Sequence, residues 1–124
     1  MKIYYLGPKG TFSYLASQKY AEQLKLQNID FVPKANLYEV IKCASQDDGT
    51  IGLAPIENSI EGTINIVADS LAKQDVYAHG ELLLDIDFAL YGQSGSQIED
   101  IKKVYSIAPA ISPVSYTHLT LPTK

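Results

Sequence analysis

The sequence predicts an α/β fold in which helices flank a mostly parallel sheet. Short, β-prone apolar runs occur at residues 2–6, 29–32 and 50–55, and each is followed by a segment whose apolar residues recur at the helical period. The run at 50–55 is apolar on both faces, as central strands of parallel sheets tend to be. Strand and helix thus alternate three times, and this order favours parallel strands joined by right-handed crossovers.

Residues typical of helix N-termini support the predicted helices. Thr11 or Ser13 is a suitable N-cap for the first helix, which should end near residue 26. Asn36 precedes Glu39 by three residues, which is the spacing of a capping box. The second and third helices are expected at about residues 37–45 and 63–72.

The pattern changes after residue 75. Side chains alternate within residues 76–91, with Leu82, Leu84 and Ile86 on one face, and this alternation predicts one or two half-buried strands. A polar turn, a short helix and a strand should follow at residues 92–97, 98–103 and 104–107.

The C-terminal residues do not continue this pattern. Pro113 and Pro122 oppose regular structure, and no acidic residue accompanies them. We therefore divide the chain into a first lobe at 1–74, the start of an incomplete second lobe at 75–112, and a foreign or disordered tail at 113–124.

Composition excludes several classes of function. The chain has 46% hydrophobic and 19% charged residues, and its net charge of -4 argues against a nucleic-acid-binding surface. No apolar run is long enough to span a membrane, and the N-terminus does not resemble a signal peptide. Cys43 is the single cysteine, so no intramolecular disulfide can form, and we expect a cytoplasmic protein. His79 and His118 lack ligand-like neighbours, so we expect no metal site.

A polar turn follows the third apolar run. It carries a carboxylate, an amide and a hydroxyl on consecutive residues, namely Glu57, Asn58 and Ser59. Open α/β sheets usually hold small ligands at strand-to-helix turns, and the free N–H groups at a helix start attract anions. The turn therefore predicts a binding site for a small acid.

Another polar turn, at residues 7–10, follows the first apolar run. Because parallel strands all end at one edge of their sheet, the two turns should open on the same edge. We expect the helix starts behind them to converge on one ligand.

These two turns also carry a resemblance to a known family. The runs GPKGTFS at 7–13 and PIENSIEG at 55–62 are similar to sequences of the prephenate dehydratase family. The stretch that begins with Gly80-Glu81 and then residues 98–106 resemble the same family.

The resemblance covers about residues 1–112. It implies a two-lobed fold related to the type 2 periplasmic-binding-protein architecture, with the active site in the cleft between the lobes. It implies a carbon–oxygen lyase that converts prephenate to phenylpyruvate, water and carbon dioxide on the route to phenylalanine. It implies no cofactor and no metal, and it leaves a homo-oligomer open.

The chain departs from the family near its end. The family's catalytic Thr-Arg-Phe motif has no match, and Thr117-His118-Leu119 does not resemble it. The family's loop that begins at the position of Ser106 ends in a glutamine, and Pro113 takes that place. The domain that binds phenylalanine in many members is also missing. We therefore expect a truncated, N-terminal fragment of the enzyme that is inactive by itself.

The resemblance points to substrate-binding roles in both turns. Thr11, Phe12 and Ser13 offer hydroxyl and backbone donors at a helix start, and plain N-capping is the alternative for this turn. Asn58 and Ser59 are expected to bind the substrate as well, because an amide donates two hydrogen bonds and accepts two.

We expect catalytic roles for Glu57, Asn58 and Ser106. A carboxylate beside an anionic substrate is unfavourable unless it is protonated or directed at the backbone, so a structural brace is the alternative for Glu57. Ser106 is expected to contact the substrate through its match to the family's loop; taken alone, it would be a turn residue.

Two other hypotheses stay open. A module that binds a small carboxylic acid without converting it fits the same residues, because a fold does not dictate a function. A truncated chain of low stability and no function of its own is the other hypothesis. It rests on the apolar surface and sheet edge that an incomplete lobe exposes.

Overall fold

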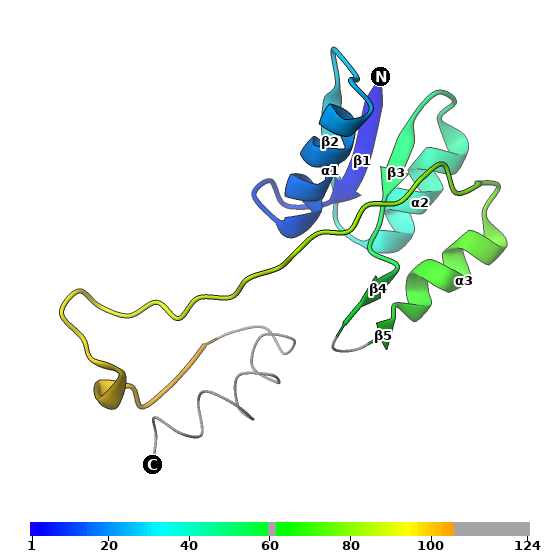
Figure 1. Cartoon of the computed structure of the whole chain (residues 1–124). Helices are drawn as coiled ribbons and strands as arrows, with labels where there is room; N and C mark the ends of the chain where they lie inside the picture. Colours follow the sequence, from blue (N-terminus) through cyan, green and yellow to red (C-terminus); the bar gives the residue numbers. More distant parts are fainter. Residues whose placement is uncertain (60–61, 106–124) are drawn as a thin grey trace. The chain divides into compact units, whose positions relative to one another are not determined.

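The computed structural model describes residues 1–59 and 62–105. A three-stranded sheet is built from β1 (Lys2–Leu6), β2 (Asp30–Lys34) and β3 (Ile51–Leu53) in the order β2-β1-β3 (Figure 1). Both β2 and β3 pair with β1 in parallel. The structure therefore confirms the α/β fold with a parallel sheet and flanking helices, small and incomplete, that the sequence predicts.

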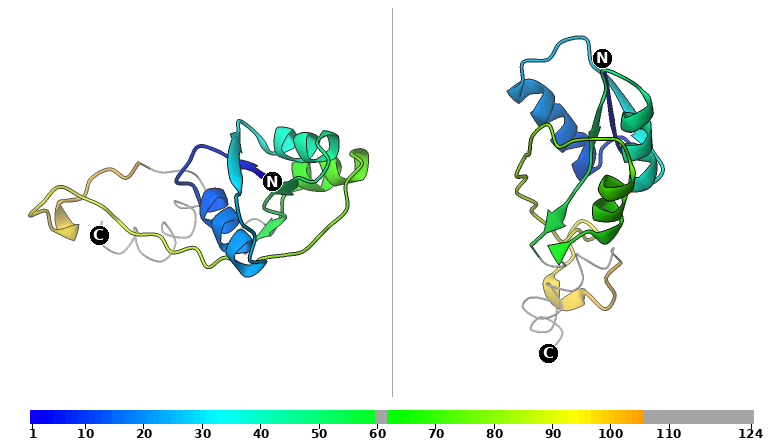
Figure 2. Two further views of the ribbon diagram at one scale, coloured as in Figure 1. Left: turned by 90° about the horizontal axis from the view of Figure 1, so that it is seen from above. Right: turned by 90° about the vertical axis from the view of Figure 1, so that its right-hand side faces the viewer.

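Helices cover both faces of this sheet. The connection from β1 to β2 contains α1 (Phe12–Gln23), and the connection from β2 back across β1 to β3 contains α2 (Leu37–Gln46). Because the two crossovers run in opposite directions along the sheet and share one hand, α1 and α2 lie on opposite faces (Figure 2). A third helix, α3 (Asn65–Lys73), packs against α2.

The central strand β1 forms the core between the two helical layers. Ile3 and Tyr5 are fully buried on the side of α1, where the Tyr5 ring lies 5.2 Å from the ring of Tyr14. The Tyr14 ring in turn lies 5.9 Å from the ring of Phe31 from β2 and is nearly perpendicular to it. Tyr4 alternates to the opposite face and lies beside the end of α2, as the period of a strand requires.

Gly52 allows α2 to approach β3 closely. A Cβ at this position would lie 2.9 Å from the Cβ of Ala44 and 3.1 Å from the carbonyl oxygen of Val40, both on α2. A side chain there would therefore push the helix away from the sheet. Val40 itself is fully buried.

The predicted helix starts are confirmed at two positions, and one helix end is corrected. Thr11 caps α1 and Asn36 caps α2, each with a side chain that accepts a backbone N–H. The first helix ends at Gln23 and not near residue 26, because Lys25 adopts a left-handed backbone conformation with φ of 55°.

The strands predicted within residues 76–91 are wrong. The described residues between α3 and the 3₁₀ turn η1 (Ile98–Asp100) contain no strand. Leu82 and Leu84 are half-buried and Leu83 is 94% exposed, so the alternation is present without a pairing partner. An extended chain and a paired strand share this side-chain period, and only the ladder of backbone hydrogen bonds distinguishes them.

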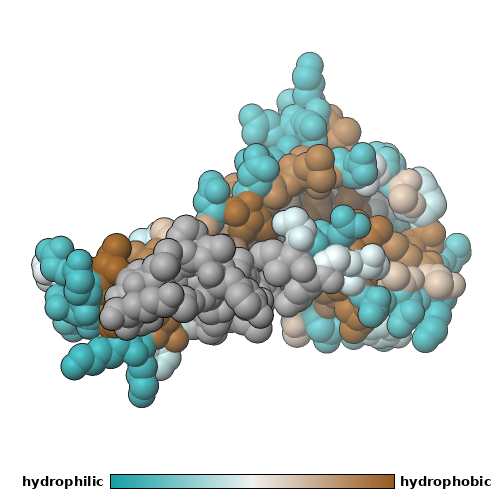
Figure 3. Space-filling view, turned by 60° about the horizontal axis from the view of Figure 1, so that its bottom comes forward, coloured by the Kyte–Doolittle hydropathy of each residue, from teal (hydrophilic) through white to brown (hydrophobic). Residues whose placement is uncertain are grey.

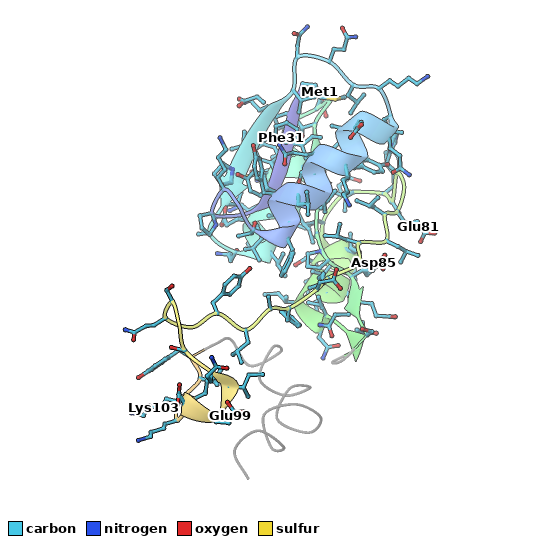
Figure 4. All side chains as sticks on the ribbon, turned by 60° about the vertical axis from the view of Figure 1, so that its left-hand side comes forward. Met1, Phe31, Glu81, Asp85, Glu99 and Lys103 are labelled. Carbon is cyan, nitrogen blue, oxygen red and sulfur yellow. The ribbon has the colours of Figure 1, made fainter. Side chains whose placement is uncertain are left out.

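The elements predicted after this segment also differ from the structure. The helix expected at 98–103 is the single turn η1, which carries Glu99, while Lys103 lies beyond its end (Figure 4). Of the strand expected at 104–107, the described residues 104 and 105 are not in a strand, and the other two lie outside the described residues.

The chain divides into two compact units, and the boundary falls between Asp85 and Ile86. The lobe limits expected from the sequence, 1–74 and 75–112, stay a prediction, and the tail at 113–124 lies outside the described residues. Within the described ranges, no helix combines the length and the apolar character that crossing a membrane needs.

Candidate functional site

The two polar loops leave the sheet at one edge. Tyr5 of β1 pairs with Leu53 of β3 in parallel register, so the chain continues past both strands in the same direction. The loop after β1 leads to α1, whereas the chain after β3 leads to α3 on the side of α2 (Figure 1). Neighbouring strands whose continuations diverge to opposite faces form a topological switch point, where open α/β sheets bind ligands. The structure thus confirms the common edge that the sequence predicts.

Gly7 begins the first loop and is closely packed. Its N–H donates to the carbonyl oxygen of Lys34 at 2.9 Å, and a Cβ at Gly7 would lie 2.8 Å from the Cβ of Pro33. Gly10 near the other end has φ of 97°, a conformation that favours glycine. The two glycines allow the loop to turn tightly between β1 and α1.

Thr11 joins this loop to α1. Its hydroxyl donates to the carbonyl oxygen of Leu6 at 3.0 Å and accepts the N–H of Tyr14 at 3.2 Å. Phe12 is 44% exposed, and Ser13 is half-buried at the first turn of the helix. The structure therefore brings the three candidate residues of the first loop together at the N-terminus of α1.

The second loop is a hairpin, not the direct strand-to-helix turn that the sequence suggests. Two short antiparallel strands, β4 (Glu57–Asn58) and β5 (Gly62–Thr63), pair with each other. Gly62 has φ of 77°, and the helix α3 begins only at Asn65. The helix expected from about residue 63 therefore begins at Asn65, because the chain reverses once before it enters the helix.

The hairpin holds the candidate residues of the second loop. Glu57 and Ser59 are exposed, and Asn58 is half-buried. They lie together on β4 and in the turn after it, so they are not at the N-terminus of α3. Ser106 lies outside the described residues.

The charges near the two loops are few. The Lys9 ammonium lies 5.7 Å from the centre of the Tyr14 ring, beside the start of α1. All ten basic residues of the chain are lysines, so this chain does not supply an arginine fork for a carboxylate. The cationic side chains at this edge include Lys9 in the first loop and Lys34 at the end of β2.

A cluster of three polar side chains lies at the opposite end of the sheet. The Tyr4 hydroxyl donates to Asp47 Oδ2 at 2.6 Å, and the Lys2 ammonium lies 3.6 Å from the same oxygen. The hydrogen bond to Asp47, together with burial, raises the pKa of Tyr4 to about 12. The same bond, assisted by Lys2, lowers the pKa of Asp47. This cluster links β1 to the C-terminal end of α2 and is remote from the two loops.

Two contacts of the structure have no signal in the sequence. Tyr4 and Asp47 are 43 residues apart, and Tyr20 and His79, whose hydroxyl and Nδ1 atoms lie 3.2 Å apart, are separated by 59. Only the folded chain brings these pairs together. A shallow hollow of about 440 Å³ along the second half of α1 and the start of β2 was not predicted either. It does not include residues of the two loops.

The face of the molecule in Figure 3 shows apolar and polar surface side by side on the first compact unit. Among the exposed apolar residues are Phe12 in the first loop and Ile56 just before β4, at 44% and 58% exposure.

A parallel sheet with two polar loops at its switch point is the layout of α/β domains that bind small molecules. Comparison with known proteins then gives the family. The model of the prephenate dehydratase family matches residues 3–117, and the chain belongs to this family.

A solved structure supports the assignment. The prephenate dehydratase of Staphylococcus aureus subsp. aureus Mu50 is similar to this chain with a TM-score of 0.74 and 63% sequence identity, over 94% of this chain and 43% of that one.

Two relatives of known name agree with the family assignment. A bifunctional chorismate mutase/prephenate dehydratase of Buchnera aphidicola is 33% identical over 90% of this chain, and the prephenate dehydratase of Methanocaldococcus jannaschii is 34% identical over 80% of it. The chain spans 29% and 36% of the length of these two proteins.

Proposed function

We propose that this chain forms part of a prephenate dehydratase, and that its two loops, 7–13 and 55–59, form part of the substrate pocket. The enzyme would convert prephenate to phenylpyruvate, water and carbon dioxide in the biosynthesis of phenylalanine, in the cytoplasm. The observation that carries the proposal is the position of both loops at the switch point between β1 and β3 in a chain of this family.

The substrate sets three requirements for the pocket. Prephenate carries two carboxylates and a hydroxyl group on a cyclohexadiene ring. The hydroxyl must leave with the help of an acid while carbon dioxide departs and the ring becomes aromatic. The pocket therefore needs anion sites, a proton donor near the hydroxyl and exclusion of water.

The first loop suits the anion site. The N-terminal end of a helix is partially positive, and α1 presents Phe12 and Ser13 in its first turn. The Ser13 hydroxyl can donate a hydrogen bond to a carboxylate, Lys9 can attract it, and the exposed ring of Phe12 can cover the apolar face of the substrate.

The second loop suits orientation and proton transfer. Asn58 can donate and accept hydrogen bonds, and the hydroxyl of Ser59 is exposed beside it. We propose that Glu57 supplies the proton that the departing hydroxyl group needs. A substrate contact from Ser106 also remains part of the proposal.

A chimeric enzyme tests this proposal. In the Staphylococcus aureus protein, the matched 43% would be replaced with the corresponding part of this chain. We expect the chimera to form phenylpyruvate, and we expect Glu57→Gln to lower kcat by about 100-fold, as for loss of a general acid. A folded chimera that forms no phenylpyruvate would contradict the proposal. A Glu57→Gln variant with unchanged kcat would contradict the role of Glu57.

A module that binds a carboxylic acid without converting it is the second candidate. It is favoured by the absence of arginine from the chain, which leaves lysines and neutral donors to bind a carboxylate. Calorimetric titration of the 124-residue chain with prephenate addresses it. Micromolar binding (roughly -8 kcal/mol) by the chain together with an inactive chimera would favour the module.

A further inference from the structure

The Thr11 hydroxyl is fully engaged as a donor within the protein. A hydroxyl has one proton to donate, and here that proton faces the carbonyl oxygen of Leu6, the last residue of β1, at 3.0 Å. The hydroxyl oxygen of Thr11 also accepts the N–H of Tyr14 in the first turn of α1 at 3.2 Å. One side chain therefore connects the end of the strand to the start of the helix across the loop 7–10.

The neighbouring hydroxyl differs in this respect. The Ser13 carbonyl accepts the hydroxyl of Ser17 at 2.8 Å, but the Ser13 side chain makes no hydrogen bond within the described part of the chain. Ser13 thus keeps its proton for a ligand, whereas Thr11 does not.

Backbone hydrogen bonds hold the two ends of the loop 7–10 in place. Gly7 is held by the carbonyl of Lys34 at 2.9 Å, and the Thr11 carbonyl accepts the N–H of Leu15 at 3.1 Å. Between these ends, Pro8, Lys9 and Gly10 are exposed. The Thr11 hydroxyl ties the helix side of this exposed loop to the backbone of β1, beside the ring contact of Tyr5 with Tyr14.

We propose that Thr11 is a positioning residue that holds the loop 7–10 and the first turn of α1 in the conformation that binds the substrate, and that its hydroxyl does not contact the substrate. This inference rests on the proposed function and replaces the direct contact expected from the sequence. Substrate recognition at this loop then falls to Ser13, Lys9 and the positive end of α1.

The chain offers a matched control. Asn36 caps α2 in the same way, because its Oδ1 accepts the N–H of Glu39 at 2.8 Å. Like Thr11, Asn36 follows a strand of the parallel sheet at its carboxyl edge. Asn36→Ala removes a cap of similar strength without touching the loop 7–10.

The experiment uses the 124-residue chain and four proteins, namely the unmodified chain, Thr11→Val, Thr11→Ser and Asn36→Ala. Calorimetric titration with prephenate gives Kd, and amide hydrogen exchange by nuclear magnetic resonance gives the protection of Tyr14 and Glu39. We expect Thr11→Val to weaken binding by about tenfold (about 1.4 kcal/mol) and to speed exchange at Tyr14. Thr11→Ser should restore both, and Asn36→Ala should speed exchange at Glu39 with an unchanged Kd.

Three results would overturn the proposal. The first is a Thr11→Val variant that binds prephenate as the unmodified chain does. The second is weaker binding by Thr11→Val with Tyr14 still protected, because the hydroxyl would then act on the substrate directly. The third is weaker binding by Asn36→Ala of the same size, because general destabilisation would then explain both variants.

The proposal can still be tested if the unmodified chain binds no prephenate or if Thr11→Val does not fold. If the unmodified chain binds no prephenate, the proposed function fails for this chain, and exchange at Tyr14 in Thr11→Val alone decides whether the hydroxyl holds the loop. If Thr11→Val does not fold, Thr11→Asp replaces it, because aspartate keeps the cap acceptor but has no proton for Leu6. Shifted amide resonances of Lys9 and Gly10 in Thr11→Asp support the proposal, and unchanged resonances overturn it.

Discussion

The region that contains β1, β2 and β3 and the segment between α3 and η1 both have runs of apolar residues in the sequence, but their structures differ. In the first region, Ile3 and Val40 are completely buried between the layers. In the second, Leu83 and Tyr91 are 94% and 90% exposed, and the described residues form no strand. The comparison shows that an apolar pattern yields a regular element only where neighbouring backbone and side chains complete it.

The largest expected effect is a loss of stability that differs between the two regions. Ile3→Ala removes a fully buried side chain from β1 and should lower the free energy of unfolding by about 2–5 kcal/mol. Leu83→Ala is the control and should change it by less than about 0.5 kcal/mol, because its side chain is already in water. Urea denaturation measures both. Equal losses in the two variants would mean that the two regions are packed alike.

Glycines give a second comparison of the same kind. Gly52→Ala places a Cβ against the backbone of α2 and should cost about 1–3 kcal/mol of unfolding free energy. Gly92→Ala, in the exposed segment, meets only Ser96 at 3.7 Å and should be nearly neutral. Urea denaturation again provides the measurement, and a neutral Gly52→Ala would show that α2 does not pack closely on β3.

The Tyr4–Asp47 bond makes the stability of the first region depend on pH. The raised pKa of Tyr4 stabilises the fold below pH 10, and this contribution is lost as the pH rises toward about 12. The lowered pKa of Asp47 stabilises the fold above its usual value of 3.8 and is lost as the pH falls below that value. Tyr4→Phe should reduce the change in Tm in both pH windows.

Tyr38→Phe is the control for this prediction. Tyr38 is 42% exposed, and its ring lies 5.9 Å from the ammonium of Lys42, a contact that phenylalanine keeps. The pH dependence of Tm should therefore be unchanged in Tyr38→Phe. A Tyr4→Phe variant whose Tm follows the unmodified chain at both extremes of pH would show that the bond to Asp47 contributes nothing.

The smallest expected effect concerns the contact between the exposed segment and α1. Tyr20→Phe removes the hydrogen bond to His79, and we expect a loss of about 0.5 kcal/mol, at the low end for a hydrogen bond because His79 is exposed. Gly80→Ala should have a similar effect, because its Cβ would collide with the Tyr20 hydroxyl. Urea denaturation measures both, and a loss as large as that of Ile3→Ala would place this segment in the core.

Much of the first region could be predicted from the sequence. Helical periodicity and cap residues located α1 and α2, and the apolar runs located the three parallel strands, because these are local signals. The common edge of the two loops followed from the direction of parallel strands. The hairpin β4–β5 was missed because strands of two residues are too short to show a period.

The remaining features could not be predicted from the residues. The alternation at 82–86 fits an extended chain as well as a strand, and nothing local reports whether a partner strand exists. The two hydrogen bonds of the Thr11 hydroxyl could not be predicted for a different reason. A threonine at a helix start indicates a cap, but its bond back to Leu6 depends on the shape of the whole loop.

Titration of the isotope-labelled chain with prephenate, followed by amide chemical shifts, tests the central claim most directly. We expect the resonances of both loops, 7–13 and 55–59, to shift together with one saturation curve, while Asp47 at the far end of the sheet stays unchanged. Shifts confined to the hollow beside α1, around Leu26 and Asn28, would contradict a substrate pocket at the switch point between β1 and β3.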